Sequence, residues 1–379
     1  MRPAYIRPMS QTIDLHSLPA MDVAGRLGRL RETLEPAGCD ALLVTKHENQ
    51  RYLSAFSGSA GMLLVTADAA LLVTDGRYRD QAAEQVAAAG ASVQVEIANS
   101  GGQLGALGRA ARGLGRIGLE AASVTWSFQL RLAELFEGAA LVPTKALVER
   151  LRVVKDEGEL ARVELACQVA DVALAQVKSR ITEGSTESEV AAELEYEMRR
   201  RGASAPAFET IVASGPNGAM PHARPTERQL GRGELVVVDF GATVDGYRSD
   251  MTRTLSFGEP DGELRELVDA VFAAQRAGLR AVTEGVSGAA VDAACRESLS
   301  EAGYGEAFLH STGHGVGLEI HEAPAVAAGS ADILPAGAVV TVEPGAYLPG
   351  RGGARIEDTV VVTPTGARVL TKSTKDYTL

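Results

Sequence analysis

Residues 236–254 have the sequence VVVDFGATVDGYRSDMTRT. Two strand-like halves flank a glycine-containing turn, DGY at 245–247, and this pattern predicts a β-hairpin. A hairpin here brings Asp239 and Asp250 near each other, although they are eleven positions apart in the chain. A carboxylate beside an apolar strand is costly to bury as a free charge, so we expect a cation that compensates both.

Two further carboxylates lie next to apolar runs. Glu343 follows VVTV, residues 339–342, and Glu357 lies just before TVVV, residues 359–362. Taken singly, each carboxylate is explained as well by a structural role, in a strand-end ion pair or a turn, as by metal binding. Four such carboxylates together with a histidine indicate one or two divalent metals with oxygen-rich ligation, and two metals that share carboxylates serve hydrolysis.

The histidines are strongly clustered. The chain has six, and four of them, His222, His310, His314 and His321, fall within one hundred residues. Three lie in HSTGHGVGLEIH, residues 310–321, a string whose three glycines are unsuited to a regular helix interior. A single histidine is usually a core or surface residue. Three in twelve residues favour a metal or acid–base site, for which histidine is the commonest side chain.

The rest of the chain divides into two regions. From Asp22 to about residue 142, short apolar runs such as ALLVT at 41–45 alternate with helical patterns, which is typical of an α/β domain. Pro143 and a rise in charge mark a junction, and the helical and strand-like patterns beyond it predict an α+β domain. The predicted organisation is a flexible N-terminal arm, an α/β domain and an α+β domain, at residues 1–20, 21–147 and 148–379.

Composition excludes several classes of protein. The 379 residues carry a formal charge of −12, from 37 basic and 49 acidic side chains, which argues against general binding to nucleic acid or to an anionic membrane. No apolar run approaches the ~20 residues that span a bilayer, and the first residues lack a signal-peptide pattern. Three cysteines far apart in the sequence indicate a reducing compartment. We expect a cytoplasmic location.

Five strings in the second half of the chain occur in an order typical of one enzyme family: VASGPNGAMPHARP (212–225), VVVDFGATVDGYRSDMTRT (236–254), HSTGHGVGLEIHE (310–322), TVEPGAY (341–347) and GARIEDTVVV (353–362). Through them the chain resembles the metallopeptidase family with the pita-bread fold, which includes methionine aminopeptidase, prolidase and aminopeptidase P. The resemblance implies an α+β pita-bread catalytic domain, in which two related halves surround a central site.

The first domain is similar to the amino-terminal domain of the two-domain members of that family. The similarity lies in NQRYLSAFSGSAG, residues 49–61, and TDGRYRDQAA, residues 74–83. It favours prolidase and aminopeptidase P over methionine aminopeptidase, which usually lacks this domain.

The resemblance implies a set of five metal ligands. By position, Asp239 binds one metal, and Asp250 and Glu357 bridge both. His314 and Glu343 bind the other, and Glu343 is also implied as the general base and proton shuttle. The implied cofactors are two divalent ions, Mn²⁺ foremost, with Co²⁺ or Zn²⁺ as alternatives.

Four further residues match positions that act on the substrate or support the ligands. His222 and His321 correspond to histidines that hold the substrate and stabilise the tetrahedral intermediate. His310 and Arg355 correspond to positions that contact the substrate or the metal ligands. Amide hydrolysis needs an activated water and stabilisation of the developing oxyanion, and metal together with histidine supplies both.

The resemblance therefore implies an exopeptidase that cleaves Xaa-Pro bonds. Proline has no N–H and a fixed φ, so ordinary strand-like substrate binding fails and a dedicated enzyme is needed. The first expectation is an Xaa-Pro aminopeptidase acting at the N-terminus of peptides, and the alternative is an Xaa-Pro dipeptidase, or prolidase. The expected partners are proline-containing peptides and, by analogy, a second copy in a homodimer. A metal-free creatinase-like hydrolase and a non-catalytic binding protein are remoter alternatives, because such relatives lose ligands that this chain keeps.

Overall fold

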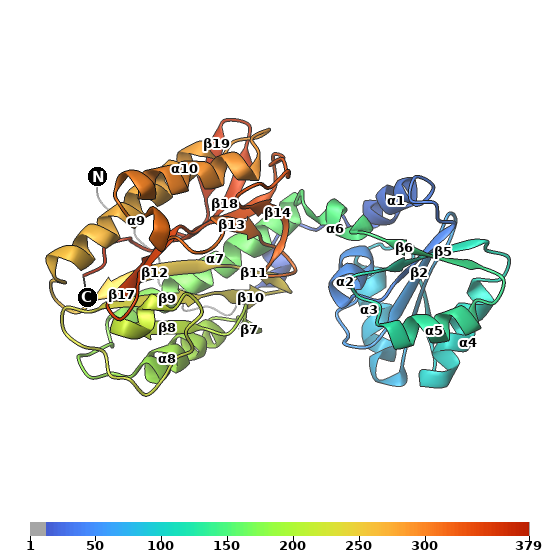
Figure 1. The fold of residues 1–379 in the computed structure, drawn as a ribbon. Coiled ribbons are helices and arrows are strands. Elements are labelled where there is room, and N and C mark those ends of the chain that lie inside the picture. The colour runs from blue at the N-terminus through green and yellow to red at the C-terminus, as the bar shows by residue number, and fades with distance from the viewer. Residues whose placement is uncertain (1–12, 379) are drawn as a thin grey trace. The chain divides into compact units, whose positions relative to one another are not determined.

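The computed structural model describes residues 13–378, which form two compact units (Figure 1). One unit comprises residues 20–152, and the other comprises residues 153–378 together with residues 13–19. Each β-sheet and each of these hydrophobic cores lies within one unit. Within the described chain, no helix is both long enough and apolar enough to span a bilayer.

The segment predicted as a flexible arm, residues 1–20, is described only in part. Residues 1–12 lie outside the described residues. The described part begins at Ile13, whose side chain packs against a core of the second unit, and continues into the 3₁₀ helix η1 (Leu15–Ser17).

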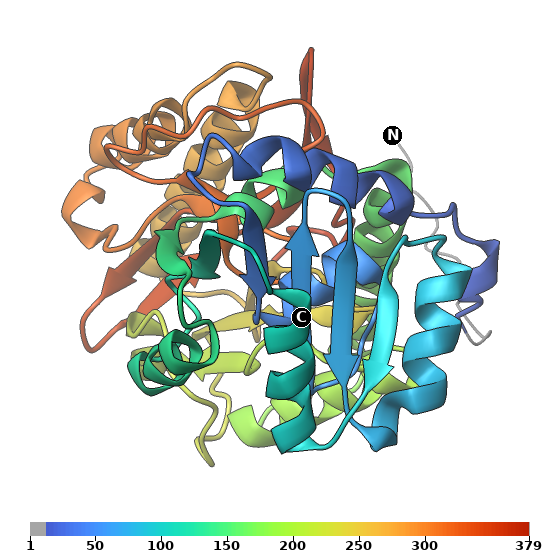
Figure 2. The same cartoon turned by 90° about the vertical axis from the view of Figure 1, so that its right-hand side faces the viewer.

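The first unit is built around a six-stranded mixed sheet. Its strands are β1 (Ala41–Val44), β2 (Met62–Thr66), β3 (Ala70–Thr74), β4 (Gln94–Ile97), β5 (Arg116–Glu120) and β6 (Ala140–Thr144). Its helices are α1 (Val23–Leu34), α2 (His47–Ser54), η2 (Gly76–Tyr78), α3 (Arg79–Ala88), α4 (Ser100–Ala110), α5 (Trp126–Leu135) and α6 (Leu147–Arg152). Figure 2 shows the blue-to-teal strands and helices of this unit.

The strand order in this sheet is β4-β3-β2-β1-β5-β6. Strands β1, β2 and β3 pair antiparallel, whereas β4, β5 and β6 are added in parallel. Leu42 and Leu43 of β1 point to opposite faces of the sheet, and both are fully buried. Both faces are therefore covered, which is the α/β arrangement that the sequence predicts.

The second unit consists of two halves of similar construction. The first half contains α7 (Glu157–Lys178), α8 (Glu187–Arg200), β7 (Ala205–Pro206), β8 (Ile211–Ser214), η3 (Gly215–Ala219), β9 (Leu235–Phe240), β10 (Ala242–Val244), β11 (Tyr247–Arg248) and β12 (Met251–Ser256). The second half contains α9 (Gly262–Ala281), α10 (Gly288–Glu301), η4 (Gly305–Ala307), β13 (Gly313–Gly315), β14 (Glu322–Val326), β15 (Val339–Val342), β16 (Gly345–Leu348), β17 (Gly352–Arg355), β18 (Asp358–Thr363) and β19 (Gly366–Val369).

In each half a pair of helices packs against a sheet. Helices α7 and α8 share a core with the β12-β9-β8 sheet. Helices α9 and α10 share a second core with the β14-β13-β15-β18-β19 sheet. Two smaller sheets, β11-β10-β7 and β16-β17, complete the unit. This is the two-half α+β architecture expected of a pita-bread domain.

The hairpin predicted for residues 236–254 is confirmed. Strands β9 and β12 pair antiparallel, with Asp239 opposite Thr252. At the turn, Asp245 and Gly246 have φ angles of 45° and 76°. A type I′ turn requires positive φ at both central residues, so the Asp-Gly pair sets the register of the hairpin.

Gly241, between β9 and β10, has no room for a side chain, because a Cβ there would stand 1.9 Å from the carbonyl oxygen of Ser249. We predict that Gly241→Ala lowers the free energy of unfolding by ~2 kcal/mol, an ordinary cost of overpacking, and the melting temperature by roughly 4–8 °C. Gly262→Ala is the control, since a Cβ at Gly262 meets nothing within 4 Å. Equal melting of the two variants in a thermal scan would contradict this account.

Candidate functional site

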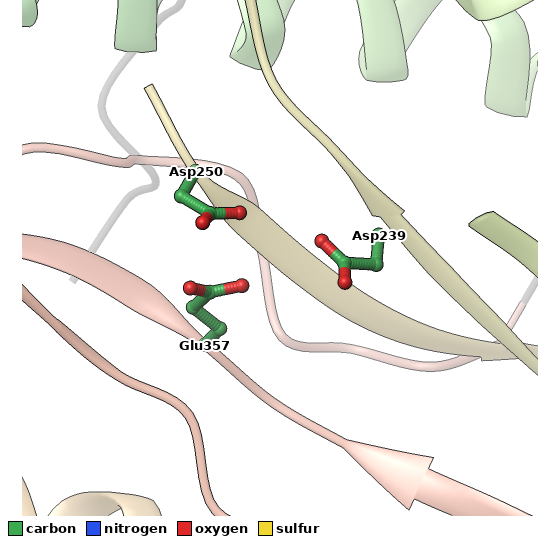
Figure 3. A group of neighbouring side chains, drawn as sticks. All are labelled: Asp239, Asp250 and Glu357. Atoms are coloured by element: carbon green, nitrogen blue, oxygen red, sulfur yellow. The ribbon is translucent and has the colours of Figure 1, made fainter. Parts of the chain in front are cut away.

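Three carboxylates meet in the interior of the second unit (Figure 3). Asp239 lies on β9, Asp250 directly precedes β12, and Glu357 directly precedes β18. One oxygen of each lies within 4.8 Å of the other two, and all three side chains are buried. Figure 3 shows them converging from the hairpin of one half and the strand of the other. Both halves therefore contribute to one acidic cluster.

Hydrogen bonds between β12 and the chain at β18 orient this cluster. The Thr252 hydroxyl donates to Glu357 Oε2 at 2.8 Å, and the Glu357 N–H donates to the Thr252 carbonyl at 3.2 Å. The Thr359 hydroxyl donates to the Asp250 carbonyl at 2.7 Å. The threonines, which sequence analysis did not single out, thus hold two of the carboxylates in place.

His314 and Glu343 extend the cluster on one side. His314 Nε2 lies 3.3 Å from Glu343 Oε1 and 3.6 Å from Asp250 Oδ2. His314 Nδ1 lies 3.0 Å from the carbonyl oxygen of Gly315, and a carbonyl only accepts, so Nδ1 carries a proton. Burial opposes a charged ring, but the Glu343 carboxylate raises the pKa of His314 above its usual value, which favours a second proton on Nε2. A bound cation would replace that proton and take the Nε2 lone pair, as metal-ligating histidines provide it.

The electrostatics of the cluster call for positive charge. Burial raises the pKa of Asp250 and of Glu357 well above their usual range, and the neighbouring carboxylates add to both shifts. Burial also raises the pKa of Asp239, against the opposing charge of Arg355. Among the described residues, Asp239 Oδ1 and Glu357 Oε1 are buried oxygens without a hydrogen-bond partner. Unpaired oxygens and disfavoured negative charge both fit a site for divalent cations.

A hydrogen-bonded chain runs from the cluster to His310. Arg355 Nη2 donates to Asp239 Oδ2 at 2.6 Å, and Nη1 donates to the Tyr347 hydroxyl at 2.7 Å. His310 Nδ1 lies 2.8 Å from the Ser311 carbonyl and so carries the proton, which leaves Nε2 to accept from Tyr347 at 2.8 Å. Sequence analysis singled out Arg355 and His310 but missed Tyr347, whose only signal is its place at the end of the TVEPGAY string.

A cavity of about 590 Å³ opens onto this site, a size typical of small-molecule sites. Of the nine residues singled out from the sequence, Glu357 does not line the cavity, and the other eight do. His222 and His321 reach it from different segments, and the rings of His314 and His321 pack edge-on with centroids 4.2 Å apart. Part of the wall is apolar and is formed by Phe208, Ile211 and Ile320.

The fold and the acidic site define a two-domain peptidase of the pita-bread class. Residues 161–364 match the sequence model of Metallopeptidase family M24, and residues 26–154 match the Creatinase/Prolidase N-terminal domain. The chain therefore belongs to metallopeptidase family M24. The family, the fold class and the peptidase class predicted from the sequence are confirmed. Membership implies divalent metal ions, which the buried acidic cluster is suited to hold.

Similar proteins cover nearly the whole chain. The structure of an Xaa-Pro dipeptidase from Bacillus anthracis has a TM-score of 0.91 at 40% identity, over 94% of this chain and 100% of that one. The Xaa-Pro dipeptidase of Pyrococcus horikoshii is 35% identical over 94% of this chain and 99% of its own length. The structure of an X-Pro aminopeptidase from Thermotoga maritima has a TM-score of 0.85 at 36% identity, over 93% of this chain and 100% of that one. Both domains are shared with these peptidases.

We predict that Glu357→Gln has opposite effects on the metal-free and the metal-loaded protein. Glutamine keeps an acceptor for the Thr252 hydroxyl and cannot carry the negative charge that burial and the neighbouring carboxylates disfavour, so the metal-free protein melts at an equal or higher temperature. Metal affinity falls more than the 10–100-fold that loss of a supporting hydrogen bond costs, because the sequence resemblance predicts Glu357 as a direct ligand.

Elemental analysis and melting curves with and without a chelator measure both effects. The control is Asp269→Asn, which alters an exposed carboxylate on α9. Full metal content in Glu357→Gln would rule out a ligand role for this residue.

Proposed function

We propose that this chain is an Xaa-Pro dipeptidase that uses two divalent metals. The observation that carries the proposal is a five-residue acidic and histidine site in a chain similar over nearly its whole length to proteins named Xaa-Pro dipeptidase. The sequence motifs by themselves put the aminopeptidase, which acts on longer peptides, first. The relatives favour the dipeptidase, and the similarity to the Thermotoga maritima X-Pro aminopeptidase keeps the aminopeptidase as the second candidate.

We assign the metal ligands as Asp239, Asp250, His314, Glu343 and Glu357. Asp250 is suited to be shared, because it belongs to the cluster with Asp239 and also lies 3.6 Å from His314. When bound, the ions activate the attacking water and stabilise negative charge on the substrate. The oxygen-rich donor set suits Mn²⁺, with Co²⁺ or Zn²⁺ as alternatives.

Glu343 is assigned as the general base. Its Oε1 accepts from the Thr341 hydroxyl at 3.2 Å and faces His314, which leaves Oε2 to take up a proton. In this role Glu343 accepts the proton of the attacking water and delivers it to the proline nitrogen as the peptide bond breaks.

His222 and His321 are assigned to the substrate. Burial lowers the pKa of His321, so its ring is neutral and one nitrogen is available as an N–H donor. His222, on the loop after η3, lines the same cavity and donates to the scissile carbonyl as it becomes tetrahedral. The apolar wall accepts the proline ring, which has no N–H to satisfy.

Substrate choice tests the proposal directly. We predict that Ala-Pro is hydrolysed faster than Ala-Pro-Ala, and that Ala-Ala-Ala and N-acetyl-Ala-Pro are slower than Ala-Pro by roughly tenfold or more, since they lack the proline ring or the free amine. Chromatographic release of free amino acids by the metal-loaded protein measures all four rates. Faster cleavage of Ala-Pro-Ala would support the aminopeptidase, and comparable cleavage of Ala-Ala-Ala would reject proline specificity.

The role of His222 is tested on one preparation of His222→Ala. Loss of a contact made only in the transition state costs ~3 kcal/mol, so we predict a kcat about a hundredfold lower with unchanged metal content. His47→Ala, at an exposed position in the first unit, is the control. Missing metal would make His222 a ligand, and an unchanged kcat would make it a bystander at the entrance.

A further inference from the structure

Two arginines are among the described residues that line the cavity, and they differ in burial and in how firmly other residues hold them. Arg355 is 3% exposed and donates to Asp239 and Tyr347, so its guanidinium is held in place inside the protein. The Arg224 side chain is 79% exposed, and its Nη2 lies 3.2 Å from Oε2 of Glu209, a side chain that is itself 63% exposed. Glu209 also lines the cavity. Arg224 is therefore the lining arginine that is able to exchange its partner for a ligand.

We infer that Arg224 binds the free carboxylate of an Xaa-Pro dipeptide, and that Glu209 competes with the substrate for the same guanidinium. The inference rests on the proposed dipeptidase function. A dipeptide carries its carboxylate on the residue that follows the scissile bond, whereas a longer peptide has a neutral amide there. A guanidinium matches a carboxylate with two parallel N–H···O bonds, which makes it the natural partner of this group.

The position of the scissile bond decides which way the dipeptide carboxylate points. In the proposed reaction the scissile carbonyl lies at the inner end, beside the assigned metal ligands Asp239, Asp250 and Glu343, and the carboxylate belongs to the residue beyond that bond. The substrate carboxylate is therefore directed away from these residues, toward the exposed lining where Arg224 lies.

The cavity lining places Arg224 next to the residue assigned to the scissile carbonyl. His222 and Arg224 are both exposed and both line the cavity, while Ala223 between them is buried. His222 lies in a turn that the Ala223 N–H closes by donating to the Met220 carbonyl oxygen at 3.2 Å, and Arg224 follows that turn. If His222 contacts the scissile carbonyl, the neighbouring Arg224 is assigned to the proline carboxylate, one residue further along the substrate.

Glu209 allows a second test of the inference, in which the expected effect on dipeptide binding is the opposite of that for Arg224. Its carboxylate occupies Arg224 in the free protein, and an exposed ion pair of this kind is weak enough to be replaced by a substrate. Removing the Glu209 charge frees the guanidinium and also removes a repulsion on the incoming carboxylate. Loss of Arg224 should therefore weaken dipeptide binding, and loss of the Glu209 charge should strengthen it.

The test compares Ala-Pro with Ala-Pro-amide, which lacks only the carboxylate charge. We expect the metal-loaded wild type to prefer the acid in kcat/KM. Arg224→Ala lowers that preference roughly tenfold, mainly through KM, as loss of a charged hydrogen bond predicts. Arg224→Lys lowers it less, and Glu209→Gln raises it. Arg232→Ala is the matched control, because Arg232 is equally exposed, pairs with exposed Glu183 and does not line the cavity.

Metal content and melting temperature are measured on each variant to confirm that the site is intact. An unchanged acid preference in Arg224→Ala, or an equal loss on acid and amide, would overturn the inference while leaving the proposed function standing. A fall in acid preference in Glu209→Gln would also overturn it. Failure of the wild type to cleave Ala-Pro would overturn the proposed function, and this inference with it.

Discussion

Like charges held together out of water are the constraint on which the rest of this structure depends. The oxygens of three buried carboxylates lie within 4.8 Å of one another, where repulsion is stronger than in solvent. Arg355 pairs with Asp239 at 2.6 Å, and the buried carboxylates of Asp250 and Glu357 are suited to compensation by divalent cations. Buried carboxylates this close are relieved either by taking up protons, as their raised pKa values indicate, or by binding a cation, which membership of the metallopeptidase family implies.

The two halves of the second unit hold this acidic cluster rigidly. Behind it, the buried Arg253 donates to the carbonyl oxygens of Thr252 and Glu357, and it pairs with Asp358 at 3.0 Å. Lys375, from the C-terminal segment, reaches the other oxygen of Asp358. Backbone from both halves is thereby fixed around one buried ion pair. Functional side chains on such cross-linked strands are positioned before a ligand arrives.

The charge distribution along the cavity accounts for how a small zwitterion could be oriented. Carboxylates gather at the metal end, and the cationic Arg224 lies on the exposed lining. Complementary potentials of this kind contribute more to orientation and specificity than to raw affinity. The apolar side chains of the same lining suit a proline ring. One cavity thus combines carboxylates suited to bind cations, an apolar wall and an exposed arginine, and the proposed Xaa-Pro dipeptidase function rests on these features.

Much of the fold and of the candidate site could be predicted from the sequence. The hairpin at 236–254 follows from strand-like runs around an Asp-Gly turn, and the metallopeptidase motifs picked out nine residues, eight of which line one cavity. Local patterns carry this information because hairpins and motif strings depend on near neighbours. The link of Arg355 to Tyr347, and from there to His310, was not readable, nor was the pairing of Arg224 with Glu209. Only the tertiary structure decided these contacts, because hydrogen bonds and ion pairs depend on where folded strands and loops place side chains, which no periodicity along the chain encodes.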